Sequence, residues 1–262
     1  MQYVDVKVHA NVATILMDRP KTRNALNPQL IEDLTTAFSD VYQEKRVASV
    51  VLTGGGEHFC SGIDLKVMSE IAQMPESSAL PEWWAVWRNL TELYESMLRF
   101  PKPIVAAVDG SALGAGLGLA LAADLIVASK RATFGAIAVR RGLVGGATAA
   151  LLSFRLGGAT AARMVLTGQM VTAIQASRWG LCDEPVDPKQ IWVAANELAS
   201  QCAAAPQEAI QATKRLLNEG VGELLLSQLS AGAAGSATAC TTEAAREGIQ
   251  SYLDNREPIW PK

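Results

Sequence analysis

The sequence has little histidine, few aromatic residues and no strong excess of charge. It contains two histidines in 262 residues, His9 and His58, so few side chains are candidates for acid–base catalysis by an imidazole. The net charge of −3, with basic residues dispersed along the chain, gives no positive field for a nucleic acid. The cysteines lack the spacing of metal ligands and suit reduced thiols in a cytoplasmic protein: Cys60, Cys182, Cys202 and Cys240. We therefore expect no metal site and no nucleic-acid partner.

Long apolar runs are missing as well. The longest charge-free stretch, residues 224–242, is diluted by Ser, Gln, Gly and Thr and lacks the apolar continuity of a membrane span. The first residues enter a strand-like alternation without a cationic and apolar leader. These absences predict a cytoplasmic location and no membrane partner. The apolar content of 49% is enough for one sizeable core.

The hydrophobic pattern predicts an α/β chain with a helical C-terminal part. Short apolar runs predict strands at 3–8, 12–17, 49–53 and 104–108, and a longer run predicts a helix over 28–44. From about residue 159 the chain is rich in alanine, and no further alternation of strand and helix is expected. The helices predicted there are 158–166, 191–205, 206–219 and 242–253.

The most informative segment is 109–124, a charge-free run with spaced glycines that follows strand 104–108 and opens a helix. The first N–H groups of a helix have no intrahelical partner, and Gly114 and Gly116 let a ligand approach the backbone closely. The segment is therefore a candidate oxyanion site. The alternative is that these glycines, with Gly118, only let a buried helix pack tightly on a sheet.

A second segment favours the oxyanion interpretation. Residues 58–66, His-Phe-Cys-Ser-Gly-Ile-Asp-Leu-Lys, follow strand 49–53 and a turn of three glycines. Together with 109–124, this segment resembles the crotonase (enoyl-CoA hydratase/isomerase) family. The resemblance extends in the family's order over nearly the whole chain, through residues 20–26, 101–103, 166–168 and 173–181.

The resemblance implies a fold, an assembly and a substrate class. The expected fold is a crotonase-like ββα spiral core over residues 1–200, which carries the acyl-CoA site. Residues 201–262 are expected to form a helical region that makes trimer contacts and covers the site. The expected assembly is a homotrimer, or a hexamer built as a dimer of trimers. The substrate is an acyl-CoA, and no cofactor is expected beyond the coenzyme A that the substrate carries.

The resemblance also implies the roles of single residues. The backbone N–H groups of Ile63 and Ala115, beside Gly116, are expected to form the oxyanion hole. Lys66 is placed near the nucleotide end of coenzyme A, and the alternative is a solvated surface lysine. The other residues expected along coenzyme A are Arg23, Ala25, Ser61, Gly62, Asp64, Leu65 and Gly114.

The chain departs from the family where acids are expected. The two carboxylates of the hydratases map to Gly118 and Ala138, and the acid of many isomerases maps to Gly146. Each positioned acid or base typically contributes about 10²–10⁴-fold, so hydration of crotonyl-CoA is expected to be slow. Placing glutamates at 118 and 138 together is expected to raise it. The nearest remaining carboxylates are Glu70, Glu82 and Glu92.

Other reactive side chains offer weaker alternatives. His58, Ser61 and Asp64 lie within one short loop, whereas a hydrolase triad draws its side chains from separate segments. Cys60 has only His9 as an activating histidine from another segment. Arg140 and Arg141 could polarise a carbonyl, or they could form a surface pair or ion pairs with neighbouring acids.

Three of the six tryptophans lie within residues 81–90. Trp83 and Trp87 share one face of a predicted helix. They belong either to the core or, as the resemblance implies, to an acyl pocket that also includes Ala138 and Gly146. In the second case the preferred acyl group is cyclic, aromatic or otherwise bulky.

The sequence therefore predicts an acyl-CoA enzyme of the hydratase/isomerase family that stabilises an enolate or oxyanion with two backbone N–H groups. Decarboxylation and thioester hydrolysis stay open, since neither reaction needs the hydratase carboxylates. A catalytically impaired acyl-CoA-binding protein is the other alternative.

Overall fold

The computed structural model describes residues 1–261, except for the side chains of residues 219–223. Its larger sheet has five strands in the order β1-β2-β3-β4-β6. β1 pairs with β2 in antiparallel fashion, and the other neighbours are parallel. These strands are β1 (Val4–His9), β2 (Val12–Met17), β3 (Ser49–Gly54), β4 (Ile104–Val108) and β6 (Leu125–Ala128). The predicted α/β fold class is confirmed.

A smaller sheet has the order β5-β7-β8, with β5 and β7 parallel and β8 antiparallel to β7. Its strands have three residues each: β5 (Ser111–Leu113), β7 (Thr133–Gly135) and β8 (Met170–Thr172). The expectation that strand and helix do not alternate after residue 159 is wrong at one place, because β8 completes this sheet and leads directly into a helix at residue 173. A strand of three residues is too short to show a period of two in the sequence.

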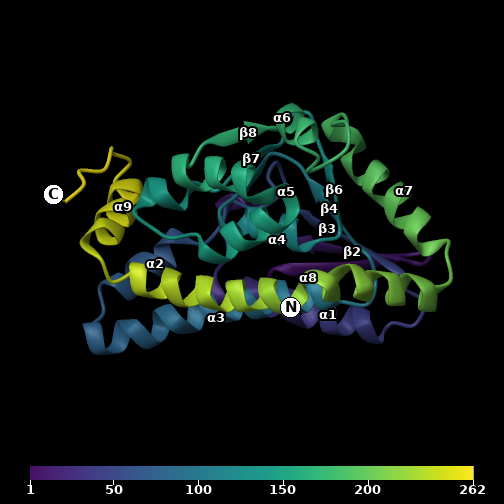
Figure 1. The fold of residues 1–262 in the computed structure, drawn as a ribbon, viewed down its shortest axis with the longest axis horizontal. Helices are drawn as coiled ribbons and strands as arrows, with labels where there is room; N and C mark the ends of the chain where they lie inside the picture. The colour runs from purple at the N-terminus through teal and green to yellow at the C-terminus, as the bar shows by residue number, and fades with distance from the viewer. Residues whose placement is uncertain (262) are drawn as a thin grey trace.

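Helices surround the two sheets (Figure 1). The α-helices are α1 (Pro28–Gln43), α2 (Leu65–Ala72), α3 (Glu76–Arg99), α4 (Ala115–Ala122), α5 (Gly146–Thr167), α6 (Ala173–Arg178), α7 (Ile191–Ala203), α8 (Gln207–Ala239) and α9 (Glu243–Leu253). Three short 3₁₀ helices are η1 (Pro20–Thr22), η2 (Ile137–Arg141) and η3 (Pro188–Gln190).

The C-terminal helices differ from their predicted bounds. α5 begins at residue 146 rather than 158, and Gly157, with φ 76° and ψ 162°, interrupts it. α8 continues through most of the charge-free stretch to residue 239. The expected boundary after residue 200 falls inside α7. By length and composition alone, α5 is the one described helix that could span a membrane, although it carries Arg155 and Arg163.

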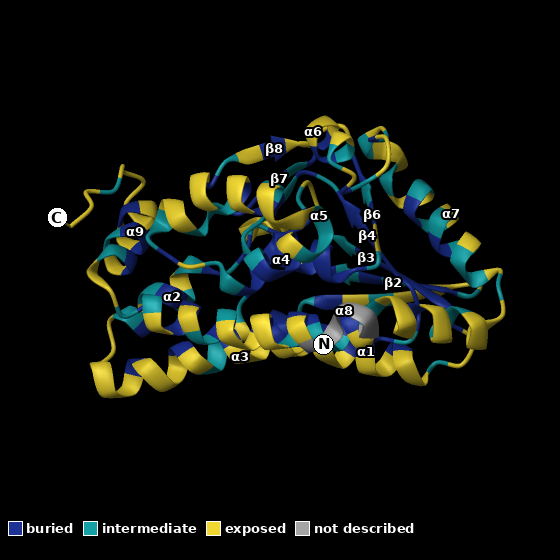
Figure 2. Ribbon diagram, in the orientation of Figure 1, coloured by how far each residue is buried: buried dark blue, intermediate teal, exposed yellow. Residues whose placement is uncertain are grey.

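Two apolar cores cover the faces of the larger sheet. In β4, Ile104, Ala106 and Val108 point into the main core, while Val105 and Ala107 meet α7 in a smaller one. This alternation follows from the two-residue period of a strand. α8 lies along α3 and α5, and its residues 225, 229, 233 and 237 join the main core. Figure 2 shows α4 buried at the centre, and all eight of its residues are buried. The fold therefore places the glycine-rich segment inside the molecule.

Candidate active site

The glycine-rich segment becomes β5 followed by α4. Gly114 precedes the first residue of the helix with φ 50° and ψ −118°, a conformation that a side chain disfavours. A Cβ atom at Gly114 would meet no atom within 4 Å, so open space lies beside this residue. The start of α4 therefore combines a glycine-specific backbone with open space beside Gly114.

The segment around Cys60 runs beside β5 and the start of α4. The N–H of Cys60 donates to the carbonyl of Ser111 at 2.9 Å, and the N–H of Leu113 donates to the carbonyl of Cys60 at 3.0 Å. A Cβ atom on Gly116 would lie 2.3 Å from the Cys60 carbonyl oxygen. Only glycine permits this approach, which brings the two predicted motifs together.

The two N–H groups expected to bind an oxyanion, those of Ile63 and Ala115, lie on these two neighbouring backbone segments. A Cβ atom on Gly62, which has φ 100°, would stand 3.5 Å from the nitrogen of Ala115. Neither the N–H of Ile63 nor that of Ala115 donates a hydrogen bond to any residue that the structure describes. Both N–H groups are therefore without a partner among the described residues.

The residues expected along coenzyme A gather beside this site. Arg19 forms a largely buried ion pair with Asp64 at 3.0 Å. Asp64 also caps α2 by accepting the N–H of Lys66 at 3.1 Å. The N–H of Ser61 donates to the carbonyl of Arg23 at 3.0 Å, which holds the two loops together. The side chain of Asp64 is thus tied to the fold by Arg19 and by the start of α2.

The remaining members of this group lie at different depths. Arg23 adopts the left-handed conformation at φ 54° and is exposed, as is Lys66 on the first turn of α2. Ala25 and Gly62 are buried, and Leu65 is half-buried. The structure therefore brings the predicted residues to one place, with two cations at its exposed edge.

Tyr94 on α3 occupies the space beside Gly118. Its hydroxyl oxygen lies 2.4 Å from where a Cβ of residue 118 would stand, and it donates to the carbonyl of Ala115 at 2.6 Å. Burial raises the pKa of Tyr94 well above its usual value, so the hydroxyl stays protonated. The sequence analysis missed this residue. Its spacing of seven from Trp87 was the available signal, since that spacing puts both side chains on one face of α3.

The other two expected acid positions differ in the room they offer. Ala138 is half-buried in η2, with its Cβ 3.2 Å from where a Cβ of Gly145 would stand. A Cβ on Gly146 would lie 2.5 Å from the Cα of Gly232 in α8. The N–H of Gly146 also donates to the hydroxyl of Ser236 at 3.2 Å. Gly146 is therefore a contact between α5 and α8 with no room for an acidic side chain.

Trp83 and Trp87 lie deep in the molecule, with 1% and 8% of their surface exposed, whereas Trp84 is 44% exposed. The indole N–H of Trp87 donates to the sulfur of Cys240 at 3.4 Å. Both buried tryptophans belong to the main core. A role as the wall of an acyl pocket stays a prediction.

The loop around His58 does not form a hydrolase triad. His58 Nδ1 accepts the N–H of Ser111 at 3.2 Å, and the Ser61 hydroxyl donates to the carbonyl of Thr22 at 3.3 Å. Asp64 is held by Arg19. Burial raises the pKa of Cys60 to about 12, which keeps its thiol protonated and unreactive.

The two arginines at the end of η2 and the nearest carboxylates lie toward the surface. Arg140 donates to the carbonyl of Thr167 at 3.4 Å, and the guanidinium of Arg141 stacks over Tyr252 at 4.6 Å. The carboxylates weighed as substitute acids are all exposed: Glu70, Glu82 and Glu92. These contacts favour surface roles for the two arginines.

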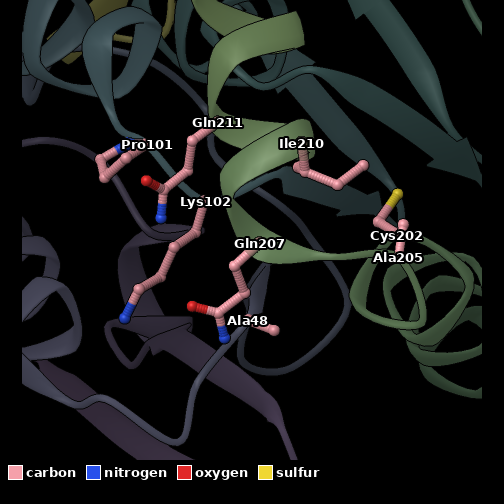
Figure 3. Close-up of a pocket in the computed structure, with 8 residues that line it drawn as sticks. All are labelled: Ala48, Pro101, Lys102, Cys202, Ala205, Gln207, Ile210 and Gln211. Carbon is pink, nitrogen blue, oxygen red and sulfur yellow. The ribbon is translucent and has the colours of Figure 1, made fainter.

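Small cavities elsewhere lie apart from the oxyanion segments. One is lined by residues such as Lys102, Cys202 and Gln207 (Figure 3). The Lys102 ammonium donates to the carbonyls of Val41 and Glu44 and so caps the end of α1. An open pocket of about 420 Å³ is lined by residues of α2 and α9, and one of about 500 Å³ adjoins β6 and α7. Among the described side chains, no three His, Cys, Asp or Glu residues gather as a metal would require.

Comparisons with known proteins agree with this geometry. The model of the enoyl-CoA hydratase/isomerase family matches residues 7–262. A putative enoyl-CoA hydratase of Thermus thermophilus is 31% identical, over 95% of this chain and 96% of that protein. The (E)-benzylidenesuccinyl-CoA hydratase of Thauera aromatica is also 31% identical, over 98% of each chain.

A solved structure shares the fold. The carnitinyl-CoA dehydratase of Mycobacterium avium superposes with a TM-score of 0.83, at 32% identity over 98% of each chain. This agreement covers both sheets and the C-terminal helices. The chain therefore belongs to the enoyl-CoA hydratase/isomerase (crotonase) family and is an acyl-CoA enzyme.

Proposed function

We propose that the enzyme binds an acyl-CoA with its thioester oxygen between the N–H groups of Ile63 and Ala115. The observation that carries this proposal is that both donors lie on adjoining backbone segments and donate to no described residue. The open space beside Gly114 admits the thioester carbonyl. An enolate or a tetrahedral oxyanion would then develop its charge at these two donors.

The start of α4 suits a developing negative charge. Two preorganised donors stabilise such a charge by several kcal/mol in a site that excludes water. The positive end of the helix dipole adds to this effect, and α4 contains no charged residue that would oppose it. Backbone groups supply the stabilisation, so the side chain of Ile63 is free to vary.

We place coenzyme A along the backbone of Arg23, Ala25, Ser61, Asp64 and Leu65. Arg23 and Lys66 are exposed at the edge of this group, where they can meet the phosphates of the nucleotide end. Asp64 is held by Arg19 and carries no free charge toward these phosphates. A cytoplasmic location and a trimer or a dimer of trimers belong to the same proposal.

The proposed reaction does not use the two hydratase carboxylates. Gly118 and Ala138 stand at the positions to which the resemblance maps them, and Gly146 stands at the isomerase position. Proton transfer must then use other groups or the substrate itself. Decarboxylation fits this constraint, because the substrate carboxylate leaves as CO₂ and its bonding electron pair forms the enolate, which then takes a proton from water. Thioester hydrolysis also fits, because water adds to the carbonyl and the coenzyme A thiolate leaves, so the hydratase pair is not required.

The acyl group is proposed to be bulky or aromatic. Trp83 and Trp87 line one face of α3, the helix that also carries Tyr94 beneath α4. The Thauera aromatica relative is named for an aromatic acyl-CoA, which supports the same substrate class. A panel of benzoyl-, cinnamoyl-, crotonyl- and malonyl-type thioesters would separate hydration, decarboxylation, hydrolysis and binding without turnover.

The test of the oxyanion site is Ala115→Pro. Proline removes the N–H but is well tolerated at the first position of a helix, which Ala115 occupies. Turnover should fall by about 10²–10³-fold, as expected for the loss of one oxyanion donor. Ala115→Gly keeps the N–H and serves as the matched control, with turnover near that of the parent enzyme. A folded Ala115→Pro enzyme with full turnover would overturn the assignment.

A further inference from the structure

The peptide group that carries the Ala115 N–H is held at its opposite end. The carbonyl of Gly114 and the N–H of Ala115 belong to one planar unit, so fixing the oxygen fixes the direction of the N–H. The Gly114 oxygen accepts the hydroxyl of Thr148 at 3.2 Å and the N–H of Gly118 at 3.1 Å. Thr148 lies in the first turn of α5 and is buried.

The next peptide group is held from the other side. The carbonyl oxygen of Ala115 accepts the hydroxyl of Tyr94 at 2.6 Å. Tyr94 comes from α3 and Thr148 from α5, so two different helices hold the two carbonyls that flank the Cα of Ala115. These hydroxyls limit rotation on both sides of the donor.

The local backbone needs such support. Gly114 adopts φ 50° and ψ −118°, and glycine has more conformational freedom than any other residue. The space where a side chain of residue 114 would stand is open, because no described atom lies within 4 Å of an ideal Cβ position. Packing against that side therefore does not fix the conformation of Gly114. The direction of the Ala115 N–H therefore depends on hydrogen bonds from outside the loop.

We propose that Tyr94 and Thr148 are positioning residues that aim the Ala115 N–H at the substrate oxygen. This inference rests on the proposed oxyanion function of Ala115. Neither hydroxyl needs to touch the substrate, since each acts through a carbonyl of the first turn of α4. The high pKa of Tyr94 keeps its hydroxyl a donor across the neutral range. A hydroxyl that fixes donor geometry should affect the rate more than substrate affinity, because a displacement of about 1 Å can cost 10²-fold in rate.

The test removes each hydroxyl without changing shape, with Tyr94→Phe and Thr148→Val. The probe is a cinnamoyl-CoA whose absorbance moves to longer wavelength when its thioester carbonyl is polarised. Each variant should bind the probe with nearly unchanged affinity, lose most of the spectral shift, and lose about 10- to 100-fold in kcat at similar KM. Thr148→Ser restores the hydroxyl and should recover both the shift and kcat.

Thr91→Val is the matched control. Thr91 lies on α3 near Tyr94, and its buried hydroxyl makes no hydrogen bond to any residue that the structure describes. This variant should keep the parent spectrum and kcat, so a loss in Tyr94→Phe is assigned to the bond with Ala115. If Tyr94→Phe and Thr148→Val keep the full shift and kcat while Ala115→Pro loses both, the positioning role is wrong and the oxyanion site stands. If Ala115→Pro also keeps the shift, the proposed function itself fails.

Discussion

The hydroxyl oxygen of Tyr94 lies 2.4 Å from the point where a Cβ atom would stand on Gly118. Tyr94 has no exposed surface and is held by its hydrogen bond to Ala115, so it cannot easily move aside. Residues 94 and 118 therefore share one volume. A large side chain at one position requires a small one at the other.

The first prediction is a strong coupling between these two residues. Gly118→Ala should destabilise the enzyme by about 1–3 kcal/mol through overpacking. In the Tyr94→Leu background the same change should cost much less, because the hydroxyl and ring atoms it meets are gone. Denaturant unfolding of the two single variants and the double variant gives the coupling energy. If the losses in unfolding free energy of the two single variants add up to that of the double variant, the Tyr94 side chain moves aside at little energetic cost and the coupling is refuted.

A second prediction concerns the restoration of glutamates. The expectation that glutamates at 118 and 138 alone raise hydration takes no account of Tyr94 and is incomplete. Gly118→Glu with Ala138→Glu should lower the melting temperature and leave crotonyl-CoA hydration slow. Adding Tyr94→Ala should recover folding, and because it also removes the hydroxyl bonded to Ala115, the hydration rate of the triple variant is compared with that of Tyr94→Ala alone, which it should exceed. A well-folded triple variant that hydrates crotonyl-CoA no faster than Tyr94→Ala alone would count against the mapping of these positions onto the hydratase carboxylates.

The third prediction separates the two roles of Trp87. Trp87→Leu keeps an apolar side chain but removes the ring and the bond to Cys240, so stability should fall by about 3 kcal/mol, near the low end for large buried truncations. If the ring also walls the acyl pocket, affinity for benzoyl-CoA should fall further than affinity for butyryl-CoA. Isothermal titration with both thioesters measures the difference. Equal losses would leave Trp87 as a core residue alone.

A fourth prediction concerns acid conditions and the C-terminal tail. Glu247 on α9 accepts hydrogen bonds from the Arg256 side chain at 2.6 and 2.9 Å and from the N–H of Ile259 at 2.6 Å. These partners, Arg256 first, lower the pKa of Glu247 from 4.5 to about 2. Because the folded pKa is the lower one, the stabilisation is complete above about pH 4.5 and is lost as the pH falls toward 2.

Amide hydrogen exchange of residues 254–261 checks this dependence. Exchange there should accelerate as the pH falls through this window, after correction for the intrinsic rates. Glu247→Gln should show fast exchange already at pH 6, with little further change on acidification. A tail that stays protected in Glu247→Gln would refute the role of this carboxylate.

Several parts of the fold were accessible from the sequence because their signals are local. The strand at Ile104–Val108 was predicted from a short apolar run, and the spaced glycines after it predicted the start of a helix. The pairing of Ile63 with Ala115 came from the family resemblance. The structure then showed that both N–H groups are free among the residues it describes.

The tertiary partners could not be predicted. Tyr94 meets Gly118 and Gly146 meets Gly232 only after helices far apart in the sequence pack together. No period or motif encodes such a contact, because it depends on the crossing of two helices. Likewise, Thr148 gives no sign in the sequence that its hydroxyl holds the carbonyl of Gly114.

The glycine contact between α5 and α8 has a mechanical consequence. Gly146 touches the backbone of Gly232, and the Ser236 hydroxyl bonds to the same turn of α5 that carries Thr148. With no flexible side chains between them, a shift of α8 displaces this turn almost rigidly. Through this turn, α8 helps to fix the Thr148 hydroxyl that donates to the carbonyl of Gly114, so a substitution that shifts α8 is expected to disturb the proposed oxyanion site as well as the helix contact.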